Sequence, residues 1–508
     1  MGNDQSSPAG PDLAQGIPIS QIPVGGMLAG HVDGEVVLLA RLADGFHAVE
    51  AFCTHYGGPL AKGLLVGDEV RCPWHHACFS VRTGAALKAP AFSALGVWRV
   101  EVVGDEVFVR AREEAPASSE LPKPADAPRR IVIVGAGAAG FAAAVRLRDL
   151  GYQGSITMLG RDDSAPYDRP NLSKDYLAGT APEEWMPLRD ADFYASHRIE
   201  LRTGCEVTAV DPDARLVRTS DGEDFGYDRL LFATGALPRP VPIPGFDHPS
   251  VLSLRTLADA HAVIERCGTA RRVVLLGAGF IGMEVAAALR RRGLDVVVLE
   301  MAEVPLQKVL GDDLGRFLVR LHEAHGVTFH LGVKVEHFDG EAVVLGDGTR
   351  VEGDFVIAGI GVVPDEELAR QAGFAVDKGI LVDDRLQASI PGHYAAGDVA
   401  RYPWKGKTAR VEHWVHAERM GQAAAANMLG ADQPFLDVPF FWTQQHGVSM
   451  RYCGLGVGWD DVRIDGDLDG RHFTARYYQG RELVAAASVG RDLENLQIEE
   501  ELQRAHRP

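Results

Sequence analysis

The stretches IVIVGAGAAG (residues 131–140) and VVLLGAGFIG (residues 273–282) decide the fold of this chain. Each is an apolar run followed by a glycine-rich turn, and each leads into a segment of helical composition, FAAAVRLRD or MEVAAALRRRG. A strand, a G-x-G-x-x-G turn and a helix form the unit that binds a dinucleotide, because free N–H groups at the helix N-terminus attract a pyrophosphate. Since the unit occurs twice, we expect two dinucleotide-binding domains built on parallel sheets.

The residues that follow each unit indicate which nucleotide it takes. The glycines of the two turns are Gly135, Gly137 and Gly140, then Gly277, Gly279 and Gly282. After the second turn the strand DVVVLE ends in Glu300, whose carboxylate would accept from a ribose 2′-hydroxyl and repel a 2′-phosphate, so NADH is favoured over NADPH. After the first turn, SITMLGRDD offers Asp162 as the nearest acidic candidate for an adenosine ribose.

A different pattern occupies residues 17–113, where short apolar runs alternate with glycine-containing turns, as in a small all-β domain. Within it, Cys53-Thr-His55 is separated by sixteen residues from Cys72-Pro-Trp-His75. Two cysteines and two histidines on two turns suit a [2Fe-2S] cluster with thiolates on one iron and imidazoles on the other. Zinc is the alternative, although its usual spacing keeps cysteines in one pair and histidines in the other. The spacing favours His75 over its neighbour His76.

Composition excludes several classes of function. The chain has 508 residues and a net charge of −19, which repels phosphate backbones and anionic lipid, so we expect neither nucleic acid nor a membrane as partner. No apolar run approaches the roughly 20 residues of a spanning helix. The first residues, MGNDQSSPAG, have neither the basic start nor the apolar stretch of a leader, which favours a cytoplasmic protein.

Both halves of the chain resemble known families. The C-x-H and C-x-x-H motifs resemble those of Rieske ferredoxins. DRLLFATGALPRP (228–240) and HYAAGDVA (393–400) resemble segments of two-dinucleotide flavoprotein reductases. PYDRPNLSKDYL (166–177) resembles a segment of oxygenase-coupled ferredoxin reductases and apoptosis-inducing-factor-like proteins. The whole is therefore similar to an apoptosis-inducing-factor-type NADH:ferredoxin reductase fused to a Rieske domain.

This resemblance implies FAD at the first glycine turn, NADH at the second, and the following boundaries. They are a polar tail (1–16), a Rieske domain (17–113), a linker (114–130), an FAD domain (131–244 and 366–435), an NAD domain (245–365) and a C-terminal α+β domain (436–508). It also implies further contacts to FAD, from Arg169, Lys174, Ala233, Thr234, Gly235, Gly397, Asp398, Glu412 and Trp414.

Lys174 and Glu284 are the catalytic candidates. The resemblance implies that Lys174 lies near the reactive flavin edge and pairs with Glu284 of the NAD-domain helix. The alternative is a surface lysine and a glutamate that merely stabilises a helix N-terminus. Trp414, and with less support Trp442, are candidates for the flavin surroundings, although aromatic side chains more often serve packing.

The expected function is electron transfer from NADH through FAD to the [2Fe-2S] cluster and then to a one-electron acceptor protein, an oxygenase or a cytochrome. The linker would let the Rieske domain swing between flavin and acceptor with His55 and His75 outermost. The chain has no C-x-x-C pair, which disfavours disulfide reduction. Two alternatives stay open: an NADH oxidase or quinone reductase with a regulatory Rieske domain, and a redox-sensing NADH-binding interaction protein. The resemblance is compatible with a homodimer.

Overall fold

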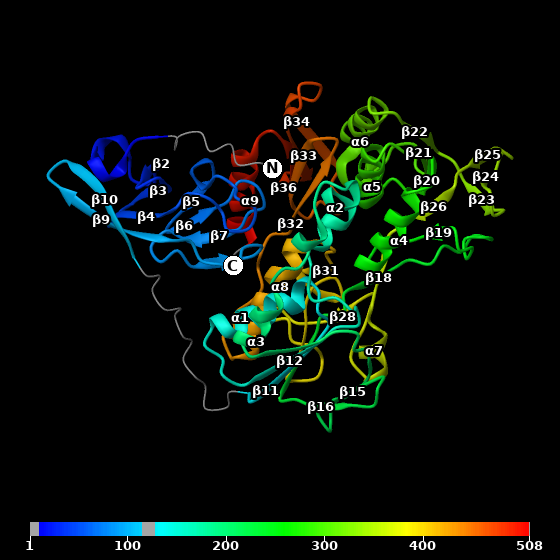
Figure 1. Cartoon of the computed structure of the whole chain (residues 1–508), viewed down its shortest axis with the longest axis horizontal. Coiled ribbons are helices and arrows are strands. Elements are labelled where there is room, and N and C mark those ends of the chain that lie inside the picture. The colour runs from blue at the N-terminus through cyan, green and yellow to red at the C-terminus, as the bar shows by residue number, and fades with distance from the viewer. Residues whose placement is uncertain (1–9, 114–127, 507–508) are drawn as a thin grey trace.

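The structure, a computed structural model, describes residues 10–113 and 128–506 (Figure 1). Most of the expected polar tail (1–16) and nearly all of the expected linker (114–130) therefore lie outside the described residues. The expected fold class is confirmed: an all-β N-terminal domain precedes two parallel-sheet domains and a C-terminal domain of antiparallel strands with one long helix.

The N-terminal domain is built on an antiparallel sheet that is covered on both faces. Successive residues of a strand point to opposite faces, so Leu38 and Ala40 of β3 join one core while Val37 and Leu39 join another. A second, smaller sheet carries the turn with Cys72 and His75, between β6 and β7. The large sheet has the order β1 (Ile17–Pro18), β10 (Glu106–Glu113), β9 (Val97–Val103), β4 (Gly45–Glu50), β3 (Glu35–Leu42), β2 (Met27–Val32). The small one has β5 (Leu64–Val66), β6 (Glu69–Arg71), β7 (Cys78–Ser80), β8 (Ala86–Lys88).

The first dinucleotide unit forms a parallel sheet with helices packed against it. Residues 131–134 are buried on both sides of β11, as a continuous apolar strand run indicates. Helix α8 (Trp414–Met428) lies directly on α1 (Ala138–Asp149). A Cβ on Gly421 would be 2.2 Å from the Ala139 carbonyl oxygen, so glycine permits this close approach. The sheet order is β13 (Ile199–Arg202), β12 (Ser155–Leu159), β11 (Arg130–Val134), β17 (Arg229–Phe232), β29 (His393–Ala395).

The second unit repeats this arrangement around helices α5 (Phe280–Arg291) and α6 (Gln307–Glu323). Its sheet order is β19 (Val251–Leu252), β26 (Phe355–Ala358), β20 (Arg272–Leu276), β21 (Asp295–Glu300), β22 (Val327–Leu331). Shorter helices are α2 (Asp175–Ala178), α3 (Ala191–Ser196), α4 (Leu257–Cys267) and α7 (Glu367–Gln371). One small antiparallel sheet has the order β14 (Val207–Asp211), β15 (Leu216–Thr219), β16 (Asp224–Gly226). Another pairs β18 (Ala236–Pro238) with β27 (Val362–Pro364), and a further one has the order β23 (Val335–Phe338), β24 (Ala342–Leu345), β25 (Arg350–Glu352). A mixed one is β28 (Ile380–Leu381), β30 (Ala400–Trp404), β31 (Lys407–Ala409).

The C-terminal domain is an antiparallel sheet covered by helix α9 (Asp492–His506). The sheet order is β32 (Phe440–Gln445), β33 (Val448–Gly454), β36 (Glu482–Val489), β35 (His472–Gln479), β34 (Asp461–Asp467). Leu496, Ile498 and Leu502 of α9 are buried and apolar, but Glu499 and Glu500 are buried too. Those two carboxylates therefore need partners outside the helix.

Each carboxylate pairs with a side chain of the N-terminal domain, which lies beside α9 in Figure 1. From the sequence we expect a Rieske domain that swings on its linker, with His55 and His75 outermost. In the structure this domain instead lies against the C-terminal domain. Both histidines are partly buried, and His75 lies against Trp442 of the C-terminal domain, with ring centroids 4.2 Å apart. The reason is a set of ion pairs and aromatic contacts between domains, which sequence spacing does not reveal.

No helix in the described parts of the chain combines the length and the apolar composition needed to cross a bilayer.

The fold buries a histidine that should make it sensitive to acid. His416 of α8 is fully buried, accepts or donates one hydrogen bond with Tyr402 Oη at 2.8 Å, and burial lowers its pKa to about 3. The unfolded chain takes up this proton below pH about 6.5, whereas the folded chain does so only near pH 3, so stability falls as pH decreases through this window.

When the pH is lowered from 7 to 5, the free energy of unfolding should decrease in the wild type because His416 resists protonation. We expect the decrease in His416→Gln to be smaller by about 2 kcal/mol. Urea unfolding at the two pH values measures this difference. Equal losses in both proteins would contradict the assignment of a buried neutral imidazole.

Candidate redox site

A cavity of about 1710 Å³ lies where the FAD, NAD and C-terminal domains meet, and it unites most of the residues singled out from the sequence. Those that line it are Gly135, Gly137, Asp162, Arg169, Lys174, Ala233, Thr234, Gly235, Gly279, Gly282, Glu284, Gly397, Asp398, Glu412, Trp414 and Trp442. Gly140, Gly277 and Glu300 are not among the residues that line it.

The first glycine turn has the shape of a pyrophosphate cradle. A Cβ on Gly135 would lie 2.2 Å from the Ala233 carbonyl oxygen, and one on Gly140 would lie 2.0 Å from the Gly135 carbonyl oxygen, so both positions are closed to side chains. Gly137 differs, because a Cβ there would meet no atom within 4 Å. It faces the cavity at the N-terminus of α1, where backbone N–H groups attract an anion. The turn thus fits the phosphates of FAD.

The second turn repeats this geometry. Cβ atoms on Gly277 and Gly282 would lie 2.5 and 2.3 Å from backbone oxygens, while one on Gly279 would meet nothing within 4 Å. Glu300 is at the end of β21, and its carboxylate accepts hydrogen bonds from Ala278 N at 2.7 Å and Ala302 N at 2.9 Å. It therefore lies beside the glycine turn, as a ribose contact requires, and fits NADH.

Lys174 and Glu284 meet in the lining of the cavity. Lys174 Nζ is 2.7 Å from Glu284 Oε2, and that carboxylate is buried on helix α5. Ser173 Oγ donates to the same oxygen at 2.5 Å, and Thr443 Oγ1 of β32 donates to Glu284 Oε1 at 2.7 Å. The FAD, NAD and C-terminal domains therefore each contribute a group to one buried ion pair. The surface-lysine alternative does not describe this arrangement.

The hydrogen bonds continue beyond Glu284 to helix α6 of the NAD domain. Gln445 Nε2 donates to Thr443 Oγ1 at 3.0 Å, and Gln445 Oε1 is 2.9 Å from His322 Nε2. His322 Nδ1 is in turn 3.2 Å from His446 Nε2. This chain links helix α6 to the carboxylate and went unnoticed in the sequence, because 159 residues separate Thr443 from Glu284 and 123 separate Gln445 from His322.

Thr443→Val should destabilise the protein by about 1–3 kcal/mol, because it keeps the shape but leaves a buried carboxylate oxygen without its donor. Urea unfolding measures the loss. Thr443→Ser, which retains the hydroxyl, is the matched control and should lose less. A valine variant as stable as the wild type would contradict the hydrogen bond's contribution.

The polar residues expected at the FAD chain have protein partners of their own. Asp398 Oδ2 is 3.2 Å from Arg255 Nη2, and Asp162 Oδ2 is 3.0 Å from Tyr167 Oη and 3.5 Å from Arg169 Nη2. Burial, followed by the neighbouring charge of Arg255, lowers the pKa of Arg169. Sequence reasoning missed Arg255, since it lies in no motif and reaches the site only through the fold.

Glu412 and Trp414 also line the cavity but differ in their surroundings. Glu412 is exposed and paired with Arg410 at 2.6 Å. Trp414 is partly buried and packs against two hydrophobic clusters, so it serves the core as well as the cavity wall.

The four cluster candidates converge in the N-terminal domain as two pairs. Cys53 and Cys72 are buried in one cluster on either side of Gly58, whose carbonyl oxygen accepts from Cys53 N at 2.9 Å, and His55 Nδ1 is 3.2 Å from His75 Nδ1. A [2Fe-2S] cluster of this type takes two thiolates on one iron and two imidazoles on the other, so a pair of cysteines beside a pair of histidines fits it.

Neighbouring residues shape this site. A Cβ on Gly58 would lie 2.6 Å from Cys72 Sγ, so glycine is needed there. Burial lowers the pKa of His55 to about 4, which keeps the imidazole neutral, as a metal ligand must be. His76 has a φ of 59°, the left-handed region that favours glycine, and turns away from His55 and His75 toward Glu499. His75, and not His76, is thus the histidine that lies beside His55.

The cluster pairs adjoin the cavity. Trp442 lines the cavity, its ring centroid is 5.8 Å from Lys174 Nζ, and it also contacts His75. Tyr56 stacks on His55 and is hydrogen-bonded through its hydroxyl to Asp168 of the FAD domain. Only one aromatic ring therefore separates His75 from the nucleotide cavity.

Two glycine cradles, a shared cavity and an adjoining cluster site define an oxidoreductase with two nucleotides and an iron–sulfur centre. The chain belongs to the pyridine nucleotide-disulphide oxidoreductase family, which residues 129–421 match. Residues 16–101 match the Rieske [2Fe-2S] domain, and residues 440–508 match the reductase C-terminal domain. The protein is thus an FAD-dependent NADH oxidoreductase that moves electrons to a fused Rieske [2Fe-2S] cluster, and the resemblance seen in the sequence is confirmed.

Particular relatives agree with this. Apoptosis-inducing factor 3 of Homo sapiens is 37% identical over 90% of this chain and 78% of its own length. Rhodocoxin reductase of Rhodococcus erythropolis is 38% identical over 72% of this chain and 87% of its own length. The crystal structure of a covalent putidaredoxin reductase–putidaredoxin complex is 35% identical, with a TM-score of 0.72, and covers 75% of this chain and 94% of that chain.

Proposed function

We propose that this chain oxidises NADH and delivers the two electrons one at a time, through its own cluster, to a separate acceptor protein such as an oxygenase component or a cytochrome. Each NADH becomes NAD⁺ and a proton, and two acceptor molecules each gain one electron. FAD, when bound, supplies the conversion from hydride to single electrons. The names of relatives such as rhodocoxin reductase and putidaredoxin reductase support an acceptor protein of this kind.

One observation carries the proposal: Trp442 contacts His75 and lines the nucleotide cavity. A regulatory Rieske domain would not need its cluster histidine at this wall. The proposed roles follow from position. Gly137 and Gly279 admit the pyrophosphates, Lys174 and Glu284 hold opposite charges beside the reacting rings, and Cys53, Cys72, His55 and His75 bind the two irons.

We also propose the domain boundaries predicted from the sequence, with the NAD domain (245–365) inserted between the two parts of the FAD domain (131–244 and 366–435). A cytoplasmic location is proposed with them, since the chain has no disulfide framework and its six cysteines are all free. Homodimer formation is a further proposal that gel filtration with light scattering tests.

The test is an absorption and EPR spectrum of the purified holoprotein before and after NADH. We expect flavin and [2Fe-2S] absorption in the oxidised protein, and a rhombic cluster signal after NADH. Stopped-flow mixing then compares the rate of cluster reduction with turnover to cytochrome c. Cluster reduction slower than turnover would overturn the proposed route and favour an oxidase or quinone reductase in which the flavin reacts directly. Bound zinc in place of iron would refute the cluster.

A further inference from the structure

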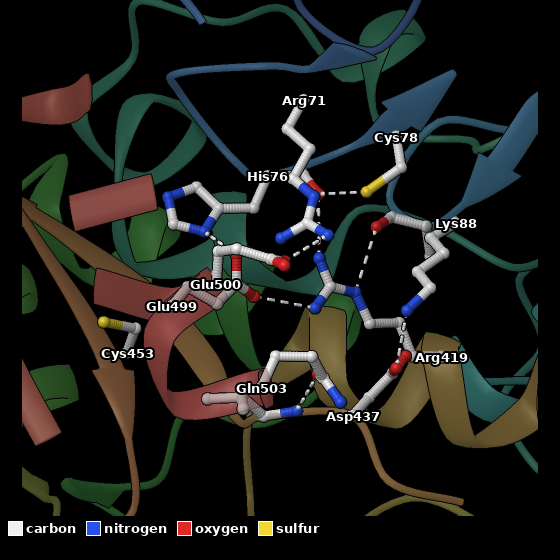
Figure 2. A network of polar contacts seen from close by, with 12 residues as sticks. Arg71, His76, Cys78, Lys88, Arg419, Asp437, Cys453, Glu499, Glu500 and Gln503 are labelled. Atoms are coloured by element: carbon white, nitrogen blue, oxygen red, sulfur yellow. Dashed lines mark hydrogen bonds and ion pairs between the residues drawn. The ribbon is translucent and has the colours of Figure 1, made fainter. Parts of the chain in front are cut away.

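A buried charge network joins the Rieske domain to the reductase (Figure 2). Its centre is Glu499 of α9, whose Oε2 is 2.7 Å from His76 Nδ1 and whose Oε1 is 3.0 Å from Arg419 Nη1. Arg419 also donates to the His76 carbonyl oxygen at 2.7 Å. All three side chains are at most 5% exposed. Since charges are buried only with partners, this network sets one relative orientation of the two domains.

Further contacts surround this centre. Arg71 of the Rieske domain pairs with Glu500 at 2.7 Å, and Lys88 pairs with Asp437 at 2.6 Å (Figure 2). Arg451 donates to the Trp74 carbonyl oxygen at 3.0 Å, so a reductase side chain holds the cluster loop directly. The contacts extend from α9 to the loop that carries His75.

Apolar contacts complete the interface. The ring of His76 stacks on Phe440 with centroids 3.8 Å apart, and Phe92 packs edge-on against Phe141 of α1 at 5.0 Å. A covalent tether raises the effective concentration of the domain at its dock to roughly millimolar. If the dissociation constant of the interface were only micromolar, the docked state would still be populated about 1000-fold more than the undocked state.

We infer that the Rieske domain is a fixed iron–sulfur partner that occupies the reductase face around Trp442 and denies that face to any separate iron–sulfur protein. Electrons reach the cluster without domain movement, and an external acceptor takes them from the docked Rieske domain and never from the flavin. This inference rests on the proposed function. It adds that the acceptor protein binds to the surface of the docked Rieske domain.

The test uses Asp437→Lys in the holoprotein. The introduced ammonium group faces Lys88 and is also close to Arg419, so it repels the Rieske side of the interface. Lys88→Glu combined with Asp437→Lys reverses the pair and should restore docking. Arg218→Ala, which breaks an exposed ion pair with Asp224 on the β15–β16 hairpin, is the matched control.

Three quantities are measured. Small-angle X-ray scattering of the oxidised protein gives the radius of gyration, which should rise only in Asp437→Lys. Stopped-flow mixing with NADH gives the rate of reduction of the chain's own cluster, which should fall by about tenfold or more. The third is the rate at which an added Rieske-type ferredoxin gains one electron, which should increase by a similar factor. The reversed pair and Arg218→Ala should match the wild type.

Opposite changes in the last two rates support the inference, because undocking slows reduction of the chain's own cluster and at the same time opens the reductase face around Trp442 to the added ferredoxin. An unchanged radius of gyration with an unchanged external rate, or a wild type that reduces the ferredoxin as fast as Asp437→Lys, would overturn it. Should Asp437→Lys not fold, Lys88→Glu alone provides the second variant with the same expected directions. The scattering measurement does not depend on electron transfer. It can therefore contradict the docking inference while the proposed function still holds.

Discussion

Replacing Cys72 with serine is expected to yield a yellow protein that NADH still bleaches but that has no [2Fe-2S] signal. An alcohol replaces a thiolate poorly as an iron ligand, and the Sγ position is buried and bounded by Gly58, so no other donor takes its place. Reduction of cytochrome c by NADH should fall by about 100-fold. Iron content, EPR and the steady-state rate measure the three consequences.

Cys267→Ser is the matched control, because this cysteine is free, partly buried and far along the chain from the Rieske domain. It should retain iron, flavin and activity. A Cys72→Ser protein with full iron content and an unchanged EPR signal would remove Cys72 from the ligand set. One that loses the cluster yet reduces cytochrome c at the wild-type rate would place the cluster outside the electron path.

The second large effect is expected from a pair of glycine substitutions that separate the two nucleotides. Gly137→Val and Gly279→Val both place a side chain where a Cβ meets no protein atom within 4 Å, so the fold tolerates them. In Gly137→Val the side chain fills the space for the FAD pyrophosphate, and the protein should be isolated without flavin. In Gly279→Val flavin should remain, while the KM for NADH should rise by about 100-fold or more.

Flavin absorbance of the purified variants and NADH titration measure these outcomes. Gly140→Ala is the contrasting control. Its new Cβ would lie 2.0 Å from the Gly135 carbonyl oxygen, so this substitution should destabilise the fold itself. Loss of flavin in Gly279→Val with retention in Gly137→Val would reverse the assignment of the two cradles. Normal binding in both would show that neither turn holds a pyrophosphate.

Much of the site was predictable because its signals are local. Glycines at Gly135 and Gly277 have φ of 111° and 101°, and the turn that requires them lies within ten residues of strand and helix. The cluster ligands occur in two short motifs for the same reason. The pairing of Lys174 with Glu284 was expected only through the resemblance, because 110 residues separate them.

Other parts of the site leave no local signal. Arg255 reaches Asp398 across 143 residues, and Thr443 reaches Glu284 across 159. The position of the Rieske domain was the largest difference from expectation. Its principal contact, between His76 and Glu499, spans 423 residues, and neither residue belongs to a motif.

The amino-acid order by itself determined which chemistry this protein holds: two glycine-rich turns and two pairs of one cysteine and one histidine, each set by the backbone conformations and donor atoms of a few adjacent residues. Only the tertiary structure decided how these centres are connected. That Trp442 lies between His75 and the cavity, and that α9 holds the Rieske domain in one orientation, depends on burial of charges and rings from distant segments. Such pairings are decided by the free energy of the whole packed interface, which no single stretch of sequence contains.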